Sequence, residues 1–243
     1  MQKRYKGFIF FICVMILNFN PANGENTLIE KKDKMNLIYV YDALCGWCYG
    51  FSPVITKIHQ KYKADFSFEV ISGGMVTGDR VGPIGEVAPY ISNAYKAVED
   101  AAGVEFGKAF LVDILEEGST RFSSFEPALA MTVFKEKFPE KAVEFSARLN
   151  KAIYYDGVQP ADLESYIPIA AELGYRERSF RRALEDEEYK TKTYLDFQKS
   201  GSLEVRGFPT VFLEINGERH RVSVGYVSYE ELEQRIQKIL TEK

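Results

Sequence analysis

Two cysteines separated by two residues, Cys45 and Cys48, stand between an apolar segment and a segment with helical periodicity. The apolar segment, residues 35–42, is rich in aromatic and β-branched side chains, which predicts a buried strand. A helix is expected over about residues 45–63, kinked at Pro53 because proline has no N–H to donate. Cys45 therefore falls where strand gives way to helix, and the free N–H groups of a helix start stabilise a thiolate there.

A zinc site is one alternative for this pair, but tetrahedral zinc needs two further ligands. The chain has two histidines, His59 and His220. His59 would lie ~21 Å along the same helix from Cys45, too far to complete a site. A metal centre is therefore not expected.

A cysteine protease is a second alternative, because Cys-Gly-Trp-Cys-Tyr approaches a known protease signature. Trp47 replaces the small residue of that signature, and Asp42 stands where a glutamine oxyanion donor belongs. A purely structural disulfide is the third alternative, although closing so short a loop removes little chain entropy. Redox chemistry is favoured over an inert disulfide, and both remain open from the pair alone.

The N-terminus has the layout of a secretory signal peptide over residues 1–24: basic residues first, an apolar run over 8–17, then a polar stretch. Cleavage is expected before Glu25. A retained membrane anchor is the alternative, although ten apolar residues fall short of the ~20 that span a bilayer. Cleavage would also remove Cys13, leaving only the close pair in an oxidising compartment. A periplasmic or otherwise exported protein is expected.

Charge argues against nucleic acid as a partner. The formal net charge is −4, and loss of the three cations in residues 1–24 would move it to −7. Phosphate binding needs clustered lysine and arginine, and the sequence has no basic run after its first residues.

The remaining pattern is a second strand over 65–72, a glycine-rich loop over 73–85, helices over 86–187, a helix closed by Gly201, and a final β-β-α segment. Asn216-Gly217 predicts a tight hairpin turn, and Ser228 with Glu231 predicts a capping box. Ser124 is expected as an N-cap. The helices between the strands are expected to run near 124–138, 140–155, 161–173 (ended by Gly174) and 178–184. The apolar stripes over 87–98 and 106–115 are interpreted as core packing.

Three stretches resemble a known family. "LCGWCYGFSPVI" resembles the active-site helix of thioredoxin, and "VRGFPTVFLEINGE" resembles the strand that carries the cis-proline of the thioredoxin fold. The helical block between them resembles the insertion of the DsbA-like branch. "AIYYDGVQPADLESYIPIAAELGY" is similar to exported predicted protein-disulfide isomerases, relatives of FrnE and of 2-hydroxychromene-2-carboxylate isomerases. The resemblance implies an α/β thioredoxin fold over 35–78 and 187–243 with a large all-helical insertion over 79–186.

The resemblance also implies site residues. Cys45 would be the nucleophile and Cys48 the resolving thiol. Pro209 would be cis and would place the Phe208 backbone where an extended substrate binds. Two further residues bear on this site. Trp47 offers an apolar rim for substrate. Asp42 is a candidate proton acceptor, or else a solvated residue at the helix start. Tyr39 stands where the thioredoxin and DsbA patterns have a buried acid.

The expected function is that of an exported, monomeric thiol-disulfide oxidoreductase acting on cysteine-containing proteins, with a redox partner protein or glutathione and no metal or organic cofactor. One alternative is a reductase or isomerase fed by an external electron donor. Others are a glutathione-dependent isomerase or transferase of a small aromatic substrate, and a redox-inert binding protein. The Gly46-Trp47 dipeptide does not set the direction of electron flow.

Overall fold

The computed structural model describes residues 35–242. The strands are β1 (Met35–Tyr41), β2 (Ser67–Ser72), β3 (Gly82–Pro83), β4 (Arg121–Phe122), β5 (Thr210–Ile215) and β6 (Glu218–Val224). The helices are α1 (Gly46–Tyr62), α2 (Ala88–Ala102), α3 (Lys108–Phe110), α4 (Phe125–Lys137), α5 (Ala142–Tyr154), α6 (Tyr166–Glu172), α7 (Glu177–Leu184), α8 (Glu187–Ser202) and α9 (Tyr229–Thr241). Short 3₁₀ segments lie at η1 (Gly78–Arg80), η2 (Ile84–Glu86), η4 (Pro139–Lys141) and η5 (Leu163–Ser165), and η3 (Leu111–Glu116) is a π-helix.

The main sheet has the strand order β2-β1-β5-β6. The central strand β1 runs parallel to β2 and antiparallel to β5, and β5 and β6 form an antiparallel hairpin. Alternate residues of β1 point to opposite faces of the sheet. Tyr39 and Tyr41 join the large core with α1, whereas Ile38 and Val40 join a smaller cluster on the other face.

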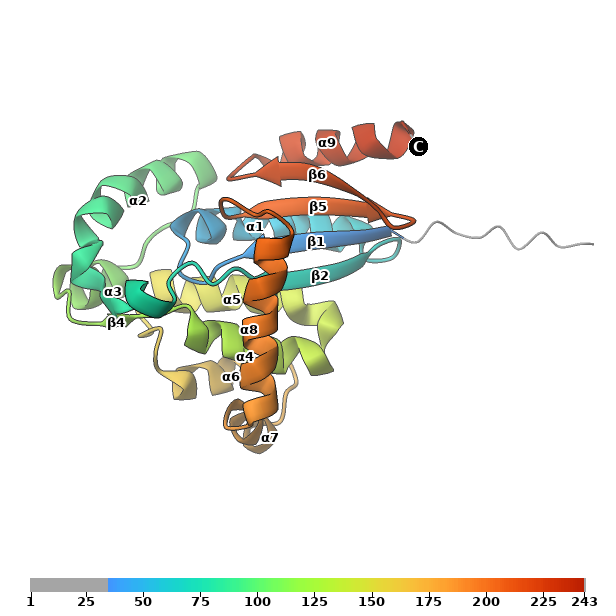
Figure 1. Cartoon of the computed structure of the whole chain (residues 1–243). Helices are drawn as coiled ribbons and strands as arrows, with labels where there is room; N and C mark the ends of the chain where they lie inside the picture. Colours follow the sequence, from blue (N-terminus) through green and yellow to red (C-terminus); the bar gives the residue numbers. More distant parts are fainter. Residues whose placement is uncertain (1–34, 243) are drawn as a thin grey trace, which may run out of the picture. The chain divides into compact units, whose positions relative to one another are not determined.

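Helices cover both faces of the sheet (Figure 1). The chain leaves the carboxyl end of β1, at the left in Figure 1, passes through a short turn, and enters α1, which returns alongside the sheet. Helices α4, α5, α6 and α7 follow β2 in the sequence, and α8 leads back to β5. The turn between β1 and α1 lies against this helical segment, because Asn150 of α5 donates to the carbonyl of Ala43.

Local signals predicted most of these elements. Helix α1 runs through Pro53 without a break. Asn216 and Gly217 both have positive φ, at 52° and 88°, as the hairpin turn requires. The hydroxyl of Ser228 accepts the N–H of Glu231 and caps α9.

Four expectations differ from the structure. The predicted loop over 73–85 contains β3, which pairs with β4. The insertion expected over 79–186 is not all-helical, because both of these short strands lie within it. The helix predicted over 161–173 begins only at Tyr166, after a 3₁₀ turn. Gly201 lies inside α8, one residue before its end.

No helix within residues 35–242 is both long and apolar enough to cross a membrane. The predicted signal peptide, residues 1–24, lies outside the described residues. The domain boundaries at 78 and 186 stay a prediction.

Candidate active site

Cys45 directly precedes α1 and is its N-cap residue, with φ −94° and ψ 110°. Its carbonyl accepts the N–H groups of Cys48 and Tyr49 at 2.9 and 3.1 Å. No side chain caps this helix start, and its first turn carries no acidic residue. No acidic side chain therefore offsets the positive end of α1, which favours a negative charge on the Cys45 sulfur.

The Cys45 thiol also meets the segment before β5. Its Sγ donates to the carbonyl oxygen of Phe208 at 3.5 Å. The Phe208-Pro209 peptide bond is cis, as predicted. The structure thus brings together the two sequence motifs that were expected to form one site, although they are far apart in the chain.

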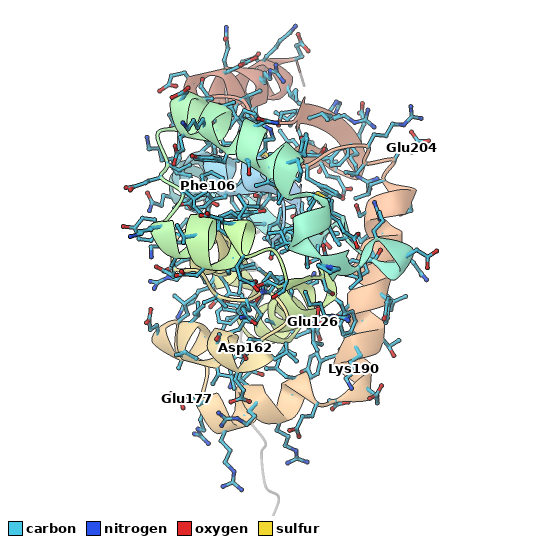
Figure 2. All side chains as sticks on the ribbon, turned by 90° about the vertical axis from the view of Figure 1, so that its left-hand side faces the viewer. Phe106, Glu126, Asp162, Glu177, Lys190 and Glu204 are labelled. Carbon is cyan, nitrogen blue, oxygen red and sulfur yellow. The ribbon has the colours of Figure 1, made fainter. Side chains whose placement is uncertain are left out.

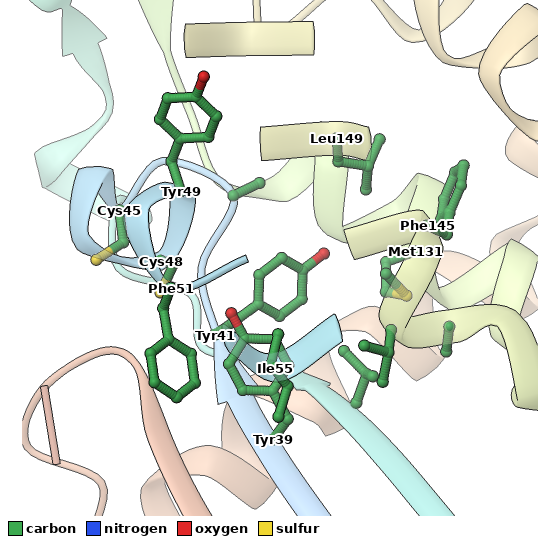
Figure 3. Close-up of a cluster of buried hydrophobic side chains, with 14 of the residues drawn as sticks. Tyr39, Tyr41, Cys45, Cys48, Tyr49, Phe51, Ile55, Met131, Phe145 and Leu149 are labelled. Atoms are coloured by element: carbon green, nitrogen blue, oxygen red, sulfur yellow. The ribbon is translucent and has the colours of Figure 1, made fainter. Parts of the chain in front are cut away.

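Cys48 lies one helical turn further along α1, behind Cys45 (Figure 3). Its side chain is completely buried, whereas that of Cys45 is 7% exposed. Burial raises the pKa of the Cys48 thiol well above its ordinary value, and contact with Cys45 raises it further. Both cysteines are free thiols. Cys45 is consequently the sulfur that a partner molecule reaches first.

Asp42 is buried, only 2% exposed, so the alternative expectation of a solvated residue at the helix start is wrong. Its carboxylate accepts the N–H of Leu44 at 2.9 Å, the N–H of Met75 at 2.7 Å and the hydroxyl of Ser124 at 2.8 Å. Burial raises the pKa of this carboxyl, and these hydrogen bonds oppose the rise. Its role as a proton acceptor stays a prediction.

Ser124 occupies the predicted N-cap position of α4, but its side chain does not cap the helix. Its hydroxyl donates to Asp42 and accepts the N–H of Val76 at 2.9 Å. The sequence correctly predicted that Ser124 directly precedes a helix. It did not predict the hydrogen-bond partner of the hydroxyl, because that partner, Asp42, is 82 residues away in the chain.

Trp47 is half-buried, and its ring centroid lies 5.8 Å from that of Tyr226. It borders a cavity of about 320 Å³ that also has Cys45 in its wall. The lining is almost wholly apolar and comes from α1, α2 and the loop after β2, with Arg80 as its charged residue. The apolar rim predicted for Trp47 therefore lies next to Cys45.

The α2 stripe, interpreted from the sequence as core packing, lines this cavity. Val87 and Tyr90 are 42% and 72% exposed, and only Val98 of α2 is fully buried. Phe106, which lies below α2 in Figure 2, also lines the cavity. The period-3.6 pattern identified an apolar face but could not show that the face borders a cavity instead of the core.

Sequence reasoning gave no role to several lining residues, Met75 and Tyr154 among them. Tyr154 is buried at the end of α5, where burial raises its pKa and the neighbouring Cys45 adds to the effect. No local pattern marks either residue, because the inserted helices and the loop meet α1 only in the folded chain.

Among residues 35–242, no group of three histidine, cysteine or acidic side chains is arranged to hold a metal ion. The ring of His59 packs against Phe68, with 4.6 Å between the centroids.

A β2-β1-β5-β6 sheet with a thiol pair at the start of its first helix and a cis-proline opposite defines the thioredoxin-fold disulfide oxidoreductases and isomerases. Residues 36–237 match the DSBA-like thioredoxin domain family, and the chain belongs to this family. The resemblance found in the sequence and the expected fold, with its inserted helices, are thereby confirmed.

Two solved structures are similar over nearly their whole length. A "putative protein disulfide isomerase" from Nitrosomonas europaea is 26% identical, with a TM-score of 0.75, over 86% of this chain and 98% of its own. The cytosolic disulfide reductase DsbM from Pseudomonas aeruginosa is 25% identical, with a TM-score of 0.71, over 86% of this chain and 100% of its own. DsbM has also been solved with GSH.

One curated relative is named as an adapter protein and not as a disulfide isomerase or reductase. The ClpXP adapter protein SpxH of Halalkalibacterium halodurans is 25% identical over 213 residues, which cover 82% of this chain and 66% of that protein. The chain thus spans just under two thirds of the length of this relative.

Proposed function

We propose that the chain is an exported thiol-disulfide oxidoreductase that exchanges disulfides with cysteine-containing proteins through Cys45 and Cys48. One observation carries this proposal. The Cys45 sulfur lies in the wall of a cavity and against the Phe208 carbonyl, while Cys48 is completely buried behind it. An accessible sulfur with a second thiol behind it suits formation and resolution of a mixed disulfide.

The exchange has two steps. The Cys45 thiolate attacks a substrate disulfide, forms a mixed disulfide, and releases the first substrate thiol. Cys48 then attacks the Cys45 sulfur, forms the Cys45–Cys48 disulfide, and releases the second substrate thiol. Two electrons pass from the dithiol to the substrate, and the reverse sequence oxidises a substrate dithiol.

The substrate would lie against Trp47, Phe208 and Pro209. The Phe208 backbone already engages the Cys45 thiol. An extended segment bound beside that carbonyl would lie in contact with the reactive sulfur, in the manner of an added strand. The ring of Trp47 offers apolar surface at the rim of the same site.

Export rests on the pattern of residues 1–24. The similar DsbM is called cytosolic, so location needs its own measurement. Cell fractionation of the full chain, followed by N-terminal analysis of the protein, should find it outside the cytoplasm and beginning at Glu25. An intact N-terminus in the soluble cytoplasmic fraction would contradict export while leaving the chemistry unaffected.

Capture of substrates tests the chemistry. Cys48→Ala removes the resolving thiol, so mixed disulfides with proteins should accumulate on Cys45 and separate as reducible adducts on gels. Cys45→Ala is the matched control and should trap none. If neither variant traps protein while the parent chain turns over a small glutathione-linked substrate, the proposed protein substrates are wrong.

A glutathione-dependent isomerase or transferase of a small aromatic compound is the second candidate. The apolar cavity of about 320 Å³ beside Cys45 favours it, because a small aromatic molecule would fit there. Glutathione also enters as a candidate redox partner, since the similar DsbM has been solved with GSH.

Direction of electron flow follows from the redox potential. Trp47 is the single tryptophan of the chain and stands between the two cysteines in the sequence, so its fluorescence should report their oxidation. Equilibration with glutathione buffers should give a potential between about −120 mV, typical of an oxidant, and about −270 mV, typical of a reductant. Absence of any exchange would contradict the redox function.

A further inference from the structure

Tyr39 lies directly beneath the first turns of α1. It is on the central strand β1, between Val70 of β2 and Val211 of β5, and is completely buried. Its ring centroid is 5.9 Å from that of Phe51, which is three residues after Cys48 on the same helix. Figure 3 shows Tyr39 rising from β1 toward the turn of α1 that carries Cys48.

The Tyr39 hydroxyl has no hydrogen-bond partner among the described residues. A buried hydroxyl without a hydrogen-bond partner is unfavourable and rare. Such a hydroxyl is available to form a hydrogen bond in another state of the protein, for example during the reaction. Burial raises the pKa of this hydroxyl well above its ordinary value, and the nearby Cys48 thiol raises it further. At physiological pH Tyr39 therefore keeps its proton, and its O–H can be donated in a hydrogen bond.

Other titratable groups also lie near Cys48, but none is as well placed to donate a hydrogen bond to its thiolate. The Asp42 carboxylate already accepts three hydrogen bonds, and its charge opposes a thiolate on Cys48. Burial is the main cause of the raised pKa values of Tyr41 and Tyr154, and the charge of Cys48 is a smaller cause for both. Cys45 is bonded to the substrate in the mixed disulfide when Cys48 reacts, so it cannot donate a hydrogen bond. The backbone N–H of Asp42 also favours the Cys48 thiolate, so Tyr39 would be a second donor.

We propose that the Tyr39 hydroxyl donates a hydrogen bond to the Cys48 thiolate while Cys48 resolves the mixed disulfide. Tyr39 is then a positioning and stabilising residue that stays neutral throughout. Cys48 and the Cys45–substrate disulfide become the Cys45–Cys48 disulfide, and the proton lost by Cys48 ends on the departing substrate thiol. This inference rests on the proposed exchange of disulfides through the two cysteines.

The test follows the two steps separately. The reduced full chain, with Cys13→Ser so that only two thiols react, is mixed with dithiobis(nitrobenzoate). Attack by Cys45 releases one thionitrobenzoate, with a rate that depends on reagent concentration. Attack by Cys48 on the Cys45 adduct releases the second, with a rate independent of that concentration.

Tyr39→Phe should slow only the second release, by about tenfold near neutral pH, because a hydrogen bond to a charged group is lost. The rise of its rate with pH should move to higher pH, since the donor favours the ionised thiol. The melting temperature should stay equal or increase, because the deleted hydroxyl has no partner in the reduced protein. Tyr41→Phe is the matched control: its hydroxyl is also buried and without a hydrogen bond among the described residues, and it should change the second rate less than about twofold.

Equal second rates in the parent and in Tyr39→Phe would overturn the inference, as would a slower rate with an unshifted pH profile. A parent protein that never releases the second thionitrobenzoate would contradict the proposed function, and the inference with it.

Discussion

The carboxylate of Asp42 joins three segments that meet around the thiol pair. Its donors are Leu44 in the turn before α1, Met75 in the loop after β2, and Ser124 before α4. Each donor is held at 2.7–2.9 Å around a side chain that is almost fully buried. Because buried donors without acceptors are costly, this one side chain stabilises the geometry of the whole loop.

Asp42→Ala should lower the free energy of unfolding by about 2–4 kcal/mol, since it leaves the N–H groups of Leu44 and Met75 and the hydroxyl of Ser124 without this acceptor. Urea unfolding of the parent and the variant measures the difference. Asp79→Ala is the matched control, because Asp79 is exposed in the same loop, and it should change stability by less than about 0.5 kcal/mol. Similar losses in both variants would contradict the role assigned to Asp42.

At the scale of elements, the loop after β2 is shaped by two aromatic rings. A Cβ on Gly73 would overlap the ring of Phe208, and a Cβ on Gly74 would lie 2.7 Å from the ring of Phe197. Gly74 also has φ +70°, which disfavours other residues. These glycines allow the segment that carries Phe208 to approach the loop and, through its carbonyl, Cys45.

Gly73→Ala should displace Phe208 and thereby move its carbonyl away from the Cys45 sulfur. We expect a loss of about 1–3 kcal/mol in stability from overpacking. We also expect slower attack by Cys45 on the chromogenic disulfide. Gly201→Ala is the control, because no atom lies within 4 Å of a Cβ placed there and alanine favours helix. It should leave the rate unchanged, and an unchanged rate in Gly73→Ala would contradict this role for the loop.

Elements with strong local signals could be predicted from the sequence, and contacts between elements could not. The hairpin at Asn216-Gly217 and the Ser228 cap depend on neighbours a few residues away, so the sequence contains their whole explanation. The partner of Ser124 and the burial of Asp42 depend on segments that meet only after folding. The cysteine pair and Pro209 could be placed together only through the family resemblance, because no local pattern states that their segments touch.

At the scale of the whole molecule, one core runs from the thiol pair into the inserted helices. A single cluster of buried side chains includes Tyr39 of β1 and Cys48 of α1 together with Phe145 of α5 and Phe180 of α7. Asn150 of α5 is also buried and donates to the carbonyl of Ala43 at 3.1 Å, next to the thiol pair. The helical segment is therefore packed as part of the same core as the sheet, and the two should lose their structure together.

Unfolding of the chain should be cooperative across both parts. Trp47 fluorescence reports the thiol site, and far-ultraviolet circular dichroism reports mainly the helices, so their urea transitions should coincide. Phe180→Ala, in α7, should lower stability by about 3–5 kcal/mol and shift both transitions equally. Arg178→Ala changes an exposed residue of the same helix and should shift neither. If Phe180→Ala moved the dichroism transition and left the Trp47 transition in place, the inserted helices would form a separate folding unit. The shared core would then not couple them to the chemistry at Cys45.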